Sequence, residues 1–372
     1  KQELEELEAL IVHLKDLLAH PEKILALIKE ETDEIAKKYG DERRTDIVTD
    51  EVEQINIEDL IKEEEMVILI SNLGYIKRIP VSAYKTQGKG GKGSASAKLV
   101  EDDFINQVFI ASTHDYVMFI TNEGKGYWLK VHEIPEAGRN SRGSHIKGLL
   151  TVSPNEEITT VVSLKEFSDD QYLFMTTAAG VVKKVQTSQF ANAKTRGIIA
   201  IRLDDGDKLV SAMLTSGNDE LLFISRRGQA LRITETSVRP MGRAGRGVTG
   251  MKLAQGDEVA AALCVVPEEM MLLLTEKGSG KRVSFEEFSS HGRGTGGQRV
   301  YNITEKTGEI IGAINVAEFD EAVCITSQGK SLRVAADSVA KQGRSASGVR
   351  VFNIDPPDMV IGLDRVANEE KE

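Results

Sequence analysis

Cysteine, aromatic residues and long apolar stretches are all scarce in this sequence. Its 372 residues include only two cysteines, Cys264 and Cys324, and both lie within apolar, strand-like segments. Two such thiols exclude a disulfide scaffold, and we interpret them as buried, reduced thiols of a cytoplasmic protein. No apolar stretch is long enough to span a bilayer and no signal peptide is present, so we expect no membrane contact.

Motifs for metal, nucleotide and catalytic chemistry are also missing. The six histidines show no ligand spacing with one another or with cysteine, which predicts no metal site. Gly88, Gly90 and Gly93 match a dinucleotide fingerprint in spacing, but the strand and helix that should flank it are not indicated. A Walker A loop is excluded because Cys324 stands where its first glycine should be. We therefore predict neither a cofactor nor a catalytic residue in this chain.

Acidic residues outnumber basic ones overall, yet the excess lies in the two ends of the chain. The formal net charge is −11, but residues 66–354 hold 36 basic and 31 acidic side chains. The central part alone is therefore compatible with a polyanionic partner.

The start of the chain has a helical pattern. Apolar residues at alternating three- and four-residue steps predict a helix over 2–19 that packs against another helix. Pro21 suits the first turn of a second helix, which should end near Gly40. We predict a helical segment at 1–40, an acidic linker at 41–65, a β domain at 66–368 and a short acidic tail at 369–372.

From Met66 onward the sequence repeats six times. Each unit has an apolar strand, a turn that contains glycine, and a second strand. The turn glycines lie 48 to 56 residues apart, and a second set of glycines keeps a similar period. A period near fifty built from short strands predicts a propeller-like ring with one small sheet, or blade, per repeat. The turn glycines are Gly74, Gly124, Gly180, Gly228, Gly278 and Gly329, and the second set is Gly93, Gly143, Gly197, Gly247, Gly297 and Gly348.

A third strand follows each glycine of the second set, and its last copy, at 359–363, lies near the end of the chain. No equivalent strand precedes the first hairpin, which starts at Met66. We therefore predict that the last strand pairs into the first blade and closes the ring, which would remove an exposed sheet edge. An open spiral is the alternative.

Basic residues gather around the second set of glycines. The loop Gln87–Gly93 combines four glycines with two lysines, and five later windows around the periodic glycines contain no Asp or Glu. Because a fixed period places equivalent loops on one rim of a ring, that rim is predicted to be basic. The candidate DNA-contacting residues are Lys85, Gln87, Gly88, Lys89, Gly90, Gly91, Lys92, Gly93, Arg139, Arg142, Lys194, Arg196, Arg239, Arg243, Arg246, Arg293, Arg299, Lys341, Arg344 and Arg350.

Duplex DNA is the polyanion that fits this rim best. Lysines and arginines beside glycines contact phosphates, which position a duplex without reading its bases. A single-strand binder would need stacking aromatic residues in these loops, and apart from Tyr84 and Tyr301 they have none. The alternatives are solvated turns that only keep the protein soluble, or a propeller that serves as a protein-interaction scaffold.

The loop Gln87–Gly93 also resembles the gyrase A box found in the A subunit of bacterial DNA gyrase, whose pattern is Gln-Arg-Arg-Gly-Gly-Lys-Gly. It differs at Gly88, which removes one basic side chain, and by Lys89 in place of the second arginine. The segments 17–25 and 39–45 look like the end of the breakage–reunion region of the same gyrase protein. The resemblance covers essentially the whole chain.

This resemblance implies a mainly β fold, a six-bladed β-pinwheel that wraps DNA, preceded by a short α-helical coiled-coil segment. It implies a nucleoid-associated part of a bacterial type IIA topoisomerase, an A2B2 complex with the gyrase B protein that introduces negative supercoils. ATP and Mg would act elsewhere in that complex, and the DNA-cleaving tyrosine would lie upstream of Lys1. The alternative is the C-terminal domain of the corresponding protein of topoisomerase IV, which has a degenerate box and serves decatenation and selection of the transported DNA segment.

Overall fold

A computed structural model describes residues 1–41, 60–71, 73–81, 105–138, 141–153, 156–328 and 331–366. The chain divides into two units, Lys1–Ile57 and Glu58–Glu372. Of the predicted site residues, Arg139, Lys85 and the loop Gln87–Gly93 lie outside the described residues.

The described part of the first unit contains two helices that meet at His20, α1 (Gln2–Ala19) and α2 (Pro21–Tyr39). Pro21 occupies the first turn of α2, where its missing N–H costs no hydrogen bond, and Gly40 is the C-cap residue. Both boundaries were predicted. Neither helix has a buried residue, and the apolar side chains at 4, 7, 11, 14 and 18 are 44–78% exposed. This apolar stripe is therefore left uncovered by the described residues.

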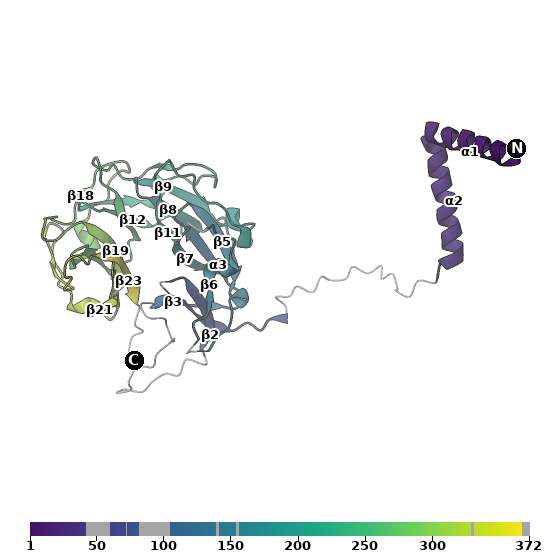
Figure 1. Cartoon of the computed structure of the whole chain (residues 1–372). Coiled ribbons are helices and arrows are strands. Elements are labelled where there is room, and N and C mark those ends of the chain that lie inside the picture. The colour runs from purple at the N-terminus through teal and green to yellow at the C-terminus, as the bar shows by residue number, and fades with distance from the viewer. Residues whose placement is uncertain are drawn as a thin grey trace. The chain divides into compact units, whose positions relative to one another are not determined.

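The second unit is the predicted ring of six small antiparallel sheets (Figure 1). Each repeat contributes a hairpin and then a third strand. The hairpins are β1 (Glu65–Ser71) with β2 (Tyr75–Pro80), β4 (Tyr116–Thr121) with β5 (Lys125–Lys130), β8 (Tyr172–Thr177) with β9 (Val181–Gln186), β12 (Glu220–Ser225) with β13 (Gln229–Thr234), β16 (Met270–Thr275) with β17 (Ser279–Ser284), and β20 (Glu321–Thr326) with β21 (Ser331–Ala335). The third strands are β3 (Ile105–Ser112), β7 (Ile158–Leu164), β11 (Leu209–Thr215), β15 (Val259–Cys264), β19 (Ile310–Val316) and β23 (Val360–Val366).

Five sheets gain a short fourth strand from the repeat that follows. These strands are β6 (Ser144–His145), β10 (Ile198–Ile199), β14 (Val248–Thr249), β18 (Gln298–Arg299) and β22 (Val349–Arg350), and each pairs with the second hairpin strand of the preceding blade. Short helices complete the connections: α3 (Ile146–Leu149) and the 3₁₀ segments η3 (Val131–Glu133), η4 (Thr187–Phe190), η5 (Lys194–Arg196), η6 (Glu235–Ser237), η7 (Phe285–Glu287) and η8 (Ala336–Ser338).

The third strands form the hub of the ring. β11 contacts β7 and β15, β19 contacts β15 and β23, and β23 contacts β3, so the last blade adjoins the first. The short fourth strands lie at the opposite sheet edges and therefore mark the rim. Within the described residues the sixth sheet has three strands.

The predicted pairing of the last strand with the first blade is wrong. β23 pairs with β20 of its own repeat, with Ala322 opposite Arg365, and β3 pairs with β1, with Val67 opposite Ile110. Each third strand returns antiparallel to the first strand of its own hairpin. The strand exchanged between neighbouring repeats is instead the two-residue rim strand, which is too short to be recognised from sequence periodicity.

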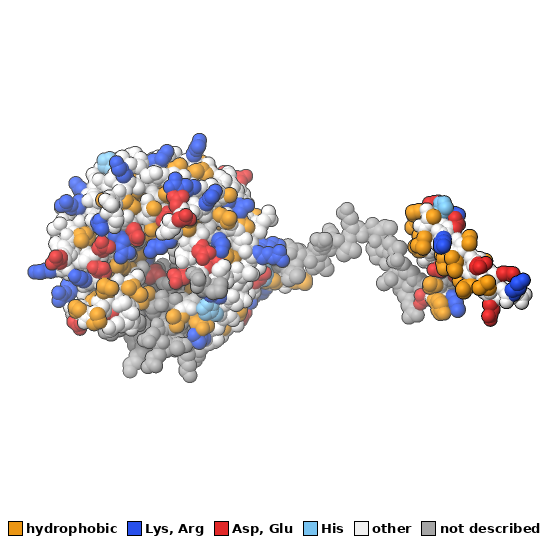
Figure 2. Space-filling view, turned by 45° about the horizontal axis from the view of Figure 1, so that its top comes forward, with side chains coloured by type: hydrophobic (Ala, Val, Ile, Leu, Met, Phe, Trp, Pro, Cys, Tyr) orange, Lys and Arg blue, Asp and Glu red, His pale blue; other side chains and the backbone are white. Residues whose placement is uncertain are grey.

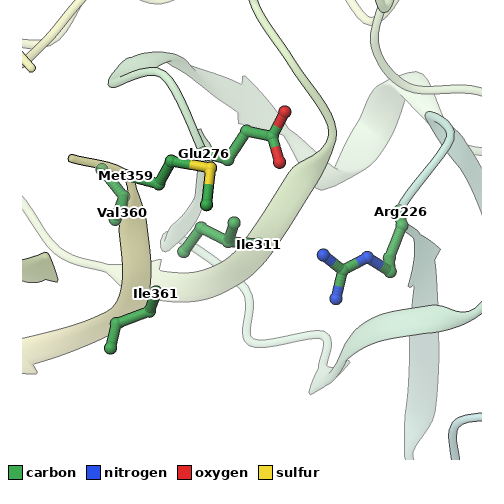
Figure 3. A pocket seen from close by; sticks show the side chains of 6 residues that line it. All are labelled: Arg226, Glu276, Ile311, Met359, Val360 and Ile361. Atoms are coloured by element: carbon green, nitrogen blue, oxygen red, sulfur yellow. The ribbon is translucent and has the colours of Figure 1, made fainter. Parts of the chain in front are cut away.

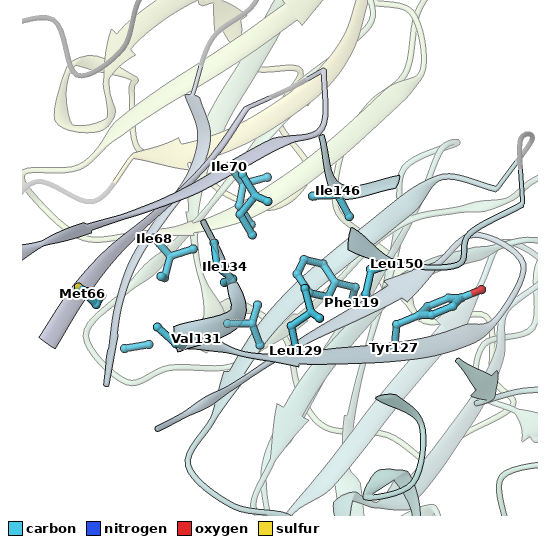
Figure 4. Packing of buried hydrophobic residues seen from close by; sticks show 13 residues of the cluster. Met66, Ile68, Ile70, Phe119, Tyr127, Leu129, Val131, Ile134, Ile146 and Leu150 are labelled. Carbon is cyan, nitrogen blue, oxygen red and sulfur yellow. The ribbon is translucent and has the colours of Figure 1, made fainter. Parts of the chain in front are cut away.

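The hydrophobic core lies between the blades. Alternate side chains of one strand enter different clusters: Phe119 of β4 packs toward the first blade, whereas Met118 packs toward the third. Figure 4 shows the first interface, where Ile68 and Ile70 of β1 approach Phe119 and Leu129 of the second blade. Burial on both faces explains why these strands are continuously apolar rather than alternating.

Both cysteines are free thiols, as expected. Cys324 is buried, but Cys264 is only partly buried, which corrects the expectation of full burial for both. Burial raises the pKa of Cys264 to about 11 and that of Cys324 to about 12, so both are protonated at neutral pH. No helix in the described ranges is long and apolar enough to cross a membrane.

Candidate nucleic-acid interface

The rim is built from loops that leave one blade and dock on the blade before it. The loop of the fourth repeat begins where Met241 N–H donates to Lys184 O (2.8 Å), and the equivalent His291 N–H donates to Arg232 O (2.8 Å). Each loop ends at a glycine of the second set, after which the two-residue rim strand begins. The second hairpin strand of one blade thereby fixes both ends of the next loop.

Neighbouring rim loops are also hydrogen-bonded to one another. Thr151 N–H donates to Thr195 O (2.9 Å), Arg202 N–H to Gly245 O (3.1 Å) and Lys252 N–H to Thr295 O (2.9 Å). The three acceptors are equivalent residues, each two positions before the periodic glycine. From the second repeat to the fifth, the rim is therefore one connected track of backbone.

The periodic glycines are needed for packing on the neighbouring blade rather than for approach to a ligand. Gly297 has a φ of +73°, and a Cβ there would lie 2.2 Å from Ala230 O. Gly292, five residues earlier, has no atom within 4 Å of the position of a Cβ. The open glycine at the start of the loop is therefore the one that a phosphate could approach closely.

We expect Gly297→Ala to destabilise the fold by about 2 kcal/mol or more, because alanine disfavours this φ and its Cβ meets a backbone oxygen. Gly292→Ala is the matched control in the same loop and should change the free energy of unfolding by less than about 0.5 kcal/mol. Chemical denaturation of the two variants measures the difference. Equal stabilities would show that the packing role of Gly297 is wrong.

The described candidate residues lie on this rim. Nine of them are exposed, and Arg243 and Arg344 are partly buried. Figure 2 shows Lys and Arg side chains projecting along the upper and left edge of the ring. The nine exposed residues are Arg142, Lys194, Arg196, Arg239, Arg246, Arg293, Arg299, Lys341 and Arg350.

Two equivalent arginines are anchored in the same way. Arg243 Nη1 donates to Ile199 O (3.4 Å), and Arg293 Nη1 donates to Thr249 O (3.3 Å). Each guanidinium thus reaches back to the rim strand of the preceding loop, and Arg293 Nε also donates to Ser237 O (3.2 Å). The remaining N–H groups of each guanidinium can donate to phosphates. Arg142 is held differently, with its guanidinium carbon 3.6 Å from the centroid of the Tyr75 ring.

The basic rim is interrupted by acidic partners that are distant in sequence. Arg246 forms an exposed ion pair with Asp204, with Nε 2.7 Å from both carboxylate oxygens. The Glu287 carboxylate accepts a hydrogen bond from the backbone N–H of Arg344 at 2.6 Å, which places a negative charge beside this rim loop. The separation of acidic and basic segments along the sequence is therefore incomplete in space, and Arg246 would have to exchange Asp204 for a phosphate.

The sequence analysis did not recognise a short motif that five of the repeated loops share. Five loops share a glycine, an adjacent Lys or Arg, and a second glycine five positions after the first. The basic residue of this motif defines equivalent positions of the sequence repeat, Lys89, Arg139, Arg243, Arg293 and Arg344. Alignment of the six repeats on their periodic glycines would have identified them.

The hub offers no comparable site among the described residues. A pocket of about 250 Å³ lies between the last three blades, lined by apolar residues of β19 and around β23 and by Arg226 and Glu276 (Figure 3). Arg226 already donates to Glu309 at 3.1 Å. In the part of the chain that the structure describes, no group of three or more His, Cys, Asp or Glu could hold a metal ion.

Comparison with known proteins identifies the family. The family described as DNA gyrase C-terminal domain, beta-propeller, matches the chain six times, at residues 65–112, 115–165, 171–216, 219–265, 269–317 and 320–367. The chain belongs to this family. The six matches coincide with the six blades, each starting at or just before a hairpin and ending at or just after a third strand.

Relatives extend the similarity over the helices. Over 98% of the present chain, the sequence is 59% identical to the DNA gyrase A protein of Treponema pallidum. Over the full length of the present chain, it is 45% identical to the DNA gyrase A protein of Brachyspira hyodysenteriae. It spans 45% of each of these relatives. A solved DNA gyrase A C-terminal domain is similar with a TM-score of 0.64 at 33% identity, covering 82% of this chain and all of the other. A C-terminal domain of DNA topoisomerase IV shares the fold, with a TM-score of 0.72 at 23% identity, over 82% of this chain and 94% of the other.

Proposed function

We propose that this domain binds duplex DNA without sequence preference, bends it around the rim of the ring and so supports ATP-dependent negative supercoiling by a gyrase A2B2 complex. The main support is the connected track of rim loops, with its periodic Arg and Lys side chains on one edge of the ring. The domain acts as a DNA-holding part of the enzyme and takes no cofactor or metal itself.

The energetics require several loops to act together. Bending roughly forty base pairs through about half a turn costs on the order of 10 kcal/mol by the elastic estimate. One loop with two phosphate contacts cannot offset that cost, whereas six loops spaced around a ring can. The hydrogen bonds between successive loops keep these contacts at fixed spacings, which favours a bent duplex over a straight one.

A second candidate is the role of a topoisomerase IV C-terminal domain, in decatenation and selection of the transported segment, since that fold superposes on this chain. The gyrase-like loop Gln87–Gly93 and the 59% identical gyrase relative favour the first candidate. A propeller that acts as a protein-interaction scaffold is a third, and it would not need a basic rim.

The salt dependence of DNA affinity tests the proposal against the scaffold. If about six to ten phosphates are contacted, the affinity for a linear duplex should fall by three to five orders of magnitude between about 50 and 200 mM salt. Duplexes of unrelated sequence should bind equally well. An affinity that is weak at low salt, or that changes little with salt, would contradict a phosphate-binding rim.

A further inference from the structure

Three lysines are fully buried at the same position of alternate blades. Lys77, Lys183 and Lys281 are the third residues of β2, β9 and β17, and they are 1%, 0% and 0% exposed. In the fourth and sixth blades a leucine takes this place, Leu231 and Leu332. A blade of this ring therefore folds without the lysine, so the lysine has another role.

Each buried ammonium group donates to backbone carbonyls of the rim loop that follows. Lys281 Nζ lies 2.7 Å from Gly343 O, 2.8 Å from Arg344 O and 2.9 Å from Ala346 O. These three carbonyls come from the loop that contains Arg344, one of the equivalent rim arginines. Three acceptors satisfy all three donors of an ammonium group.

The other two lysines repeat this arrangement. Lys183 Nζ donates to Arg243 O and, at 2.9 Å, to Gly245 O and Ala200 O, so it joins two successive loops. Lys77 Nζ donates to Ser141 O at 2.9 Å and lies 3.4 Å from Gly138 O. Apart from Ala200, which follows the rim strand of the third repeat, the acceptors occupy equivalent places in the second, fourth and sixth loops.

The fifth loop, residues 292–297, gives the contrast. It docks over Leu231, where no buried cation can bind its carbonyls. Loops held by lysine have carbonyls turned into the protein, and carbonyl oxygens exposed at the rim would repel phosphates. The buried positive charge also lies directly behind the loop backbone.

We propose that Lys77, Lys183 and Lys281 are positioning residues for DNA binding, which fix alternate rim loops so that their arginines face the phosphates. The inference rests on the DNA-binding function proposed above. It assigns to the rim three loops fixed by a buried ammonium group, and it contrasts them with the described third and fifth loops, whose backbone hydrogen bonds include none from a buried lysine.

The charge state of these lysines provides a specific signature. Burial lowers the pKa of Lys183 to about 8, with Arg243 adding to the effect, and burial lowers that of Lys281 to about 8 against the opposing Glu287. Tyr301, 5.3 Å from Lys281, is neutral here because burial raises its pKa to about 12. Lys184, the neighbour of Lys183, is paired with Glu235 at 3.5 Å.

The sign of the pH effect follows from these groups. As the pH rises through about 8 the ammonium groups lose their protons, so a carbonyl in each loop loses its donor and DNA affinity falls. The stability of the fold has the opposite trend. Between about pH 8 and 9, Lys183 and Lys281 bind more protons in the unfolded chain than in the folded one, so their contribution to the free energy of unfolding rises with pH. Above about pH 9 the two thiols, whose pKa values are raised by burial, act in the opposite direction. A falling affinity between about pH 8 and 9 therefore reports the loops and not global unfolding.

The test compares the chain with its Lys183→Leu/Lys281→Leu variant, using the residue that the fourth and sixth blades already accept. Without DNA, amide exchange should become about tenfold faster or more in loops 242–247 and 343–348 and stay unchanged in loop 292–297. Affinity for a linear duplex at about pH 7 should fall roughly tenfold, and its decrease toward about pH 9.5 should disappear. Lys165→Leu/Lys208→Leu removes the same charge from exposed sites outside the loops and should change neither exchange nor the pH profile.

Unchanged exchange in both loops, or a pH profile that persists in the variant, would overturn the positioning role. If the variant does not fold, the original chain decides: an affinity that is constant from about pH 7 to 9.5 contradicts the proposal. If the chain binds no DNA at any salt concentration, the proposed function fails, while the exchange measurement still tests whether the lysines hold the loops.

Discussion

Replacing Gln87–Gly93 with alanines is expected to abolish negative supercoiling by the assembled enzyme while binding of linear DNA stays largely intact. This loop has four glycines in seven residues, more than the other rim loops, so its amides can follow the phosphates closely. It also belongs to the first repeat, next to the linker, where a bent duplex must be held to reach the rest of the enzyme. Relaxation and decatenation, which need no wrapping, should continue.

The matched control is Arg243→Ala/Arg246→Ala, which removes two basic side chains from another rim loop. If all loops were equivalent, this control would impair supercoiling as much as the alanine replacement does. Topoisomer gels of the two reconstituted enzymes give the comparison. Supercoiling at a near-normal rate by the Gln87–Gly93 variant would show that the loop has no special role.

The second large effect is expected from the arginines at four of the five equivalent positions of the repeated loop motif. Replacing Arg139, Arg243, Arg293 and Arg344 with alanine removes up to four phosphate contacts. The slope of log affinity against log salt should then flatten by about three to four, and affinity at about 0.1 M salt should fall on the order of a thousandfold. Binding titrations at several salt concentrations measure both quantities.

Four exposed lysines outside the rim loops provide the charge-matched control, Lys165, Lys208, Lys277 and Lys306. Their replacement changes the net charge equally and should alter the slope by less than about one. Equal losses in the two variants would mean that DNA senses only the overall charge. In that case the rim has no defined phosphate contacts.

Much of the ring could be predicted from local signals. The hairpins were recognisable because each apolar strand ends in Ser or Thr, three residues before a glycine that takes a positive φ in the turns described. In five of the turns that Ser or Thr oxygen accepts the N–H of the first residue of the next strand, as Ser71 does from Tyr75 at 3.1 Å. Period and turn chemistry together were sufficient for the six blades.

Contacts between repeats could not be predicted in the same way. The third strands are similar in length and all rich in apolar residues, so the sequence alone did not distinguish pairing within a repeat from pairing across the ring. The ion pair of Arg246 with Asp204 joins residues 42 positions apart. Lys183 and Lys184 look like one exposed basic pair, yet both are buried, because the blade is covered on both faces. Which residues a rim loop meets depends on the packing of neighbouring blades, and no local pattern records that.

The most direct test of the account is the linking number of DNA closed in the presence of this chain. Nicked circular DNA is incubated with the chain, ligated, stripped of protein and resolved into topoisomers. If duplex DNA is wrapped around the rim, the distribution should shift progressively as protein is added, and the four-arginine variant should produce no shift. If the chain binds the DNA but leaves the distribution as it is without protein, the rim holds DNA without wrapping it and the central claim is wrong.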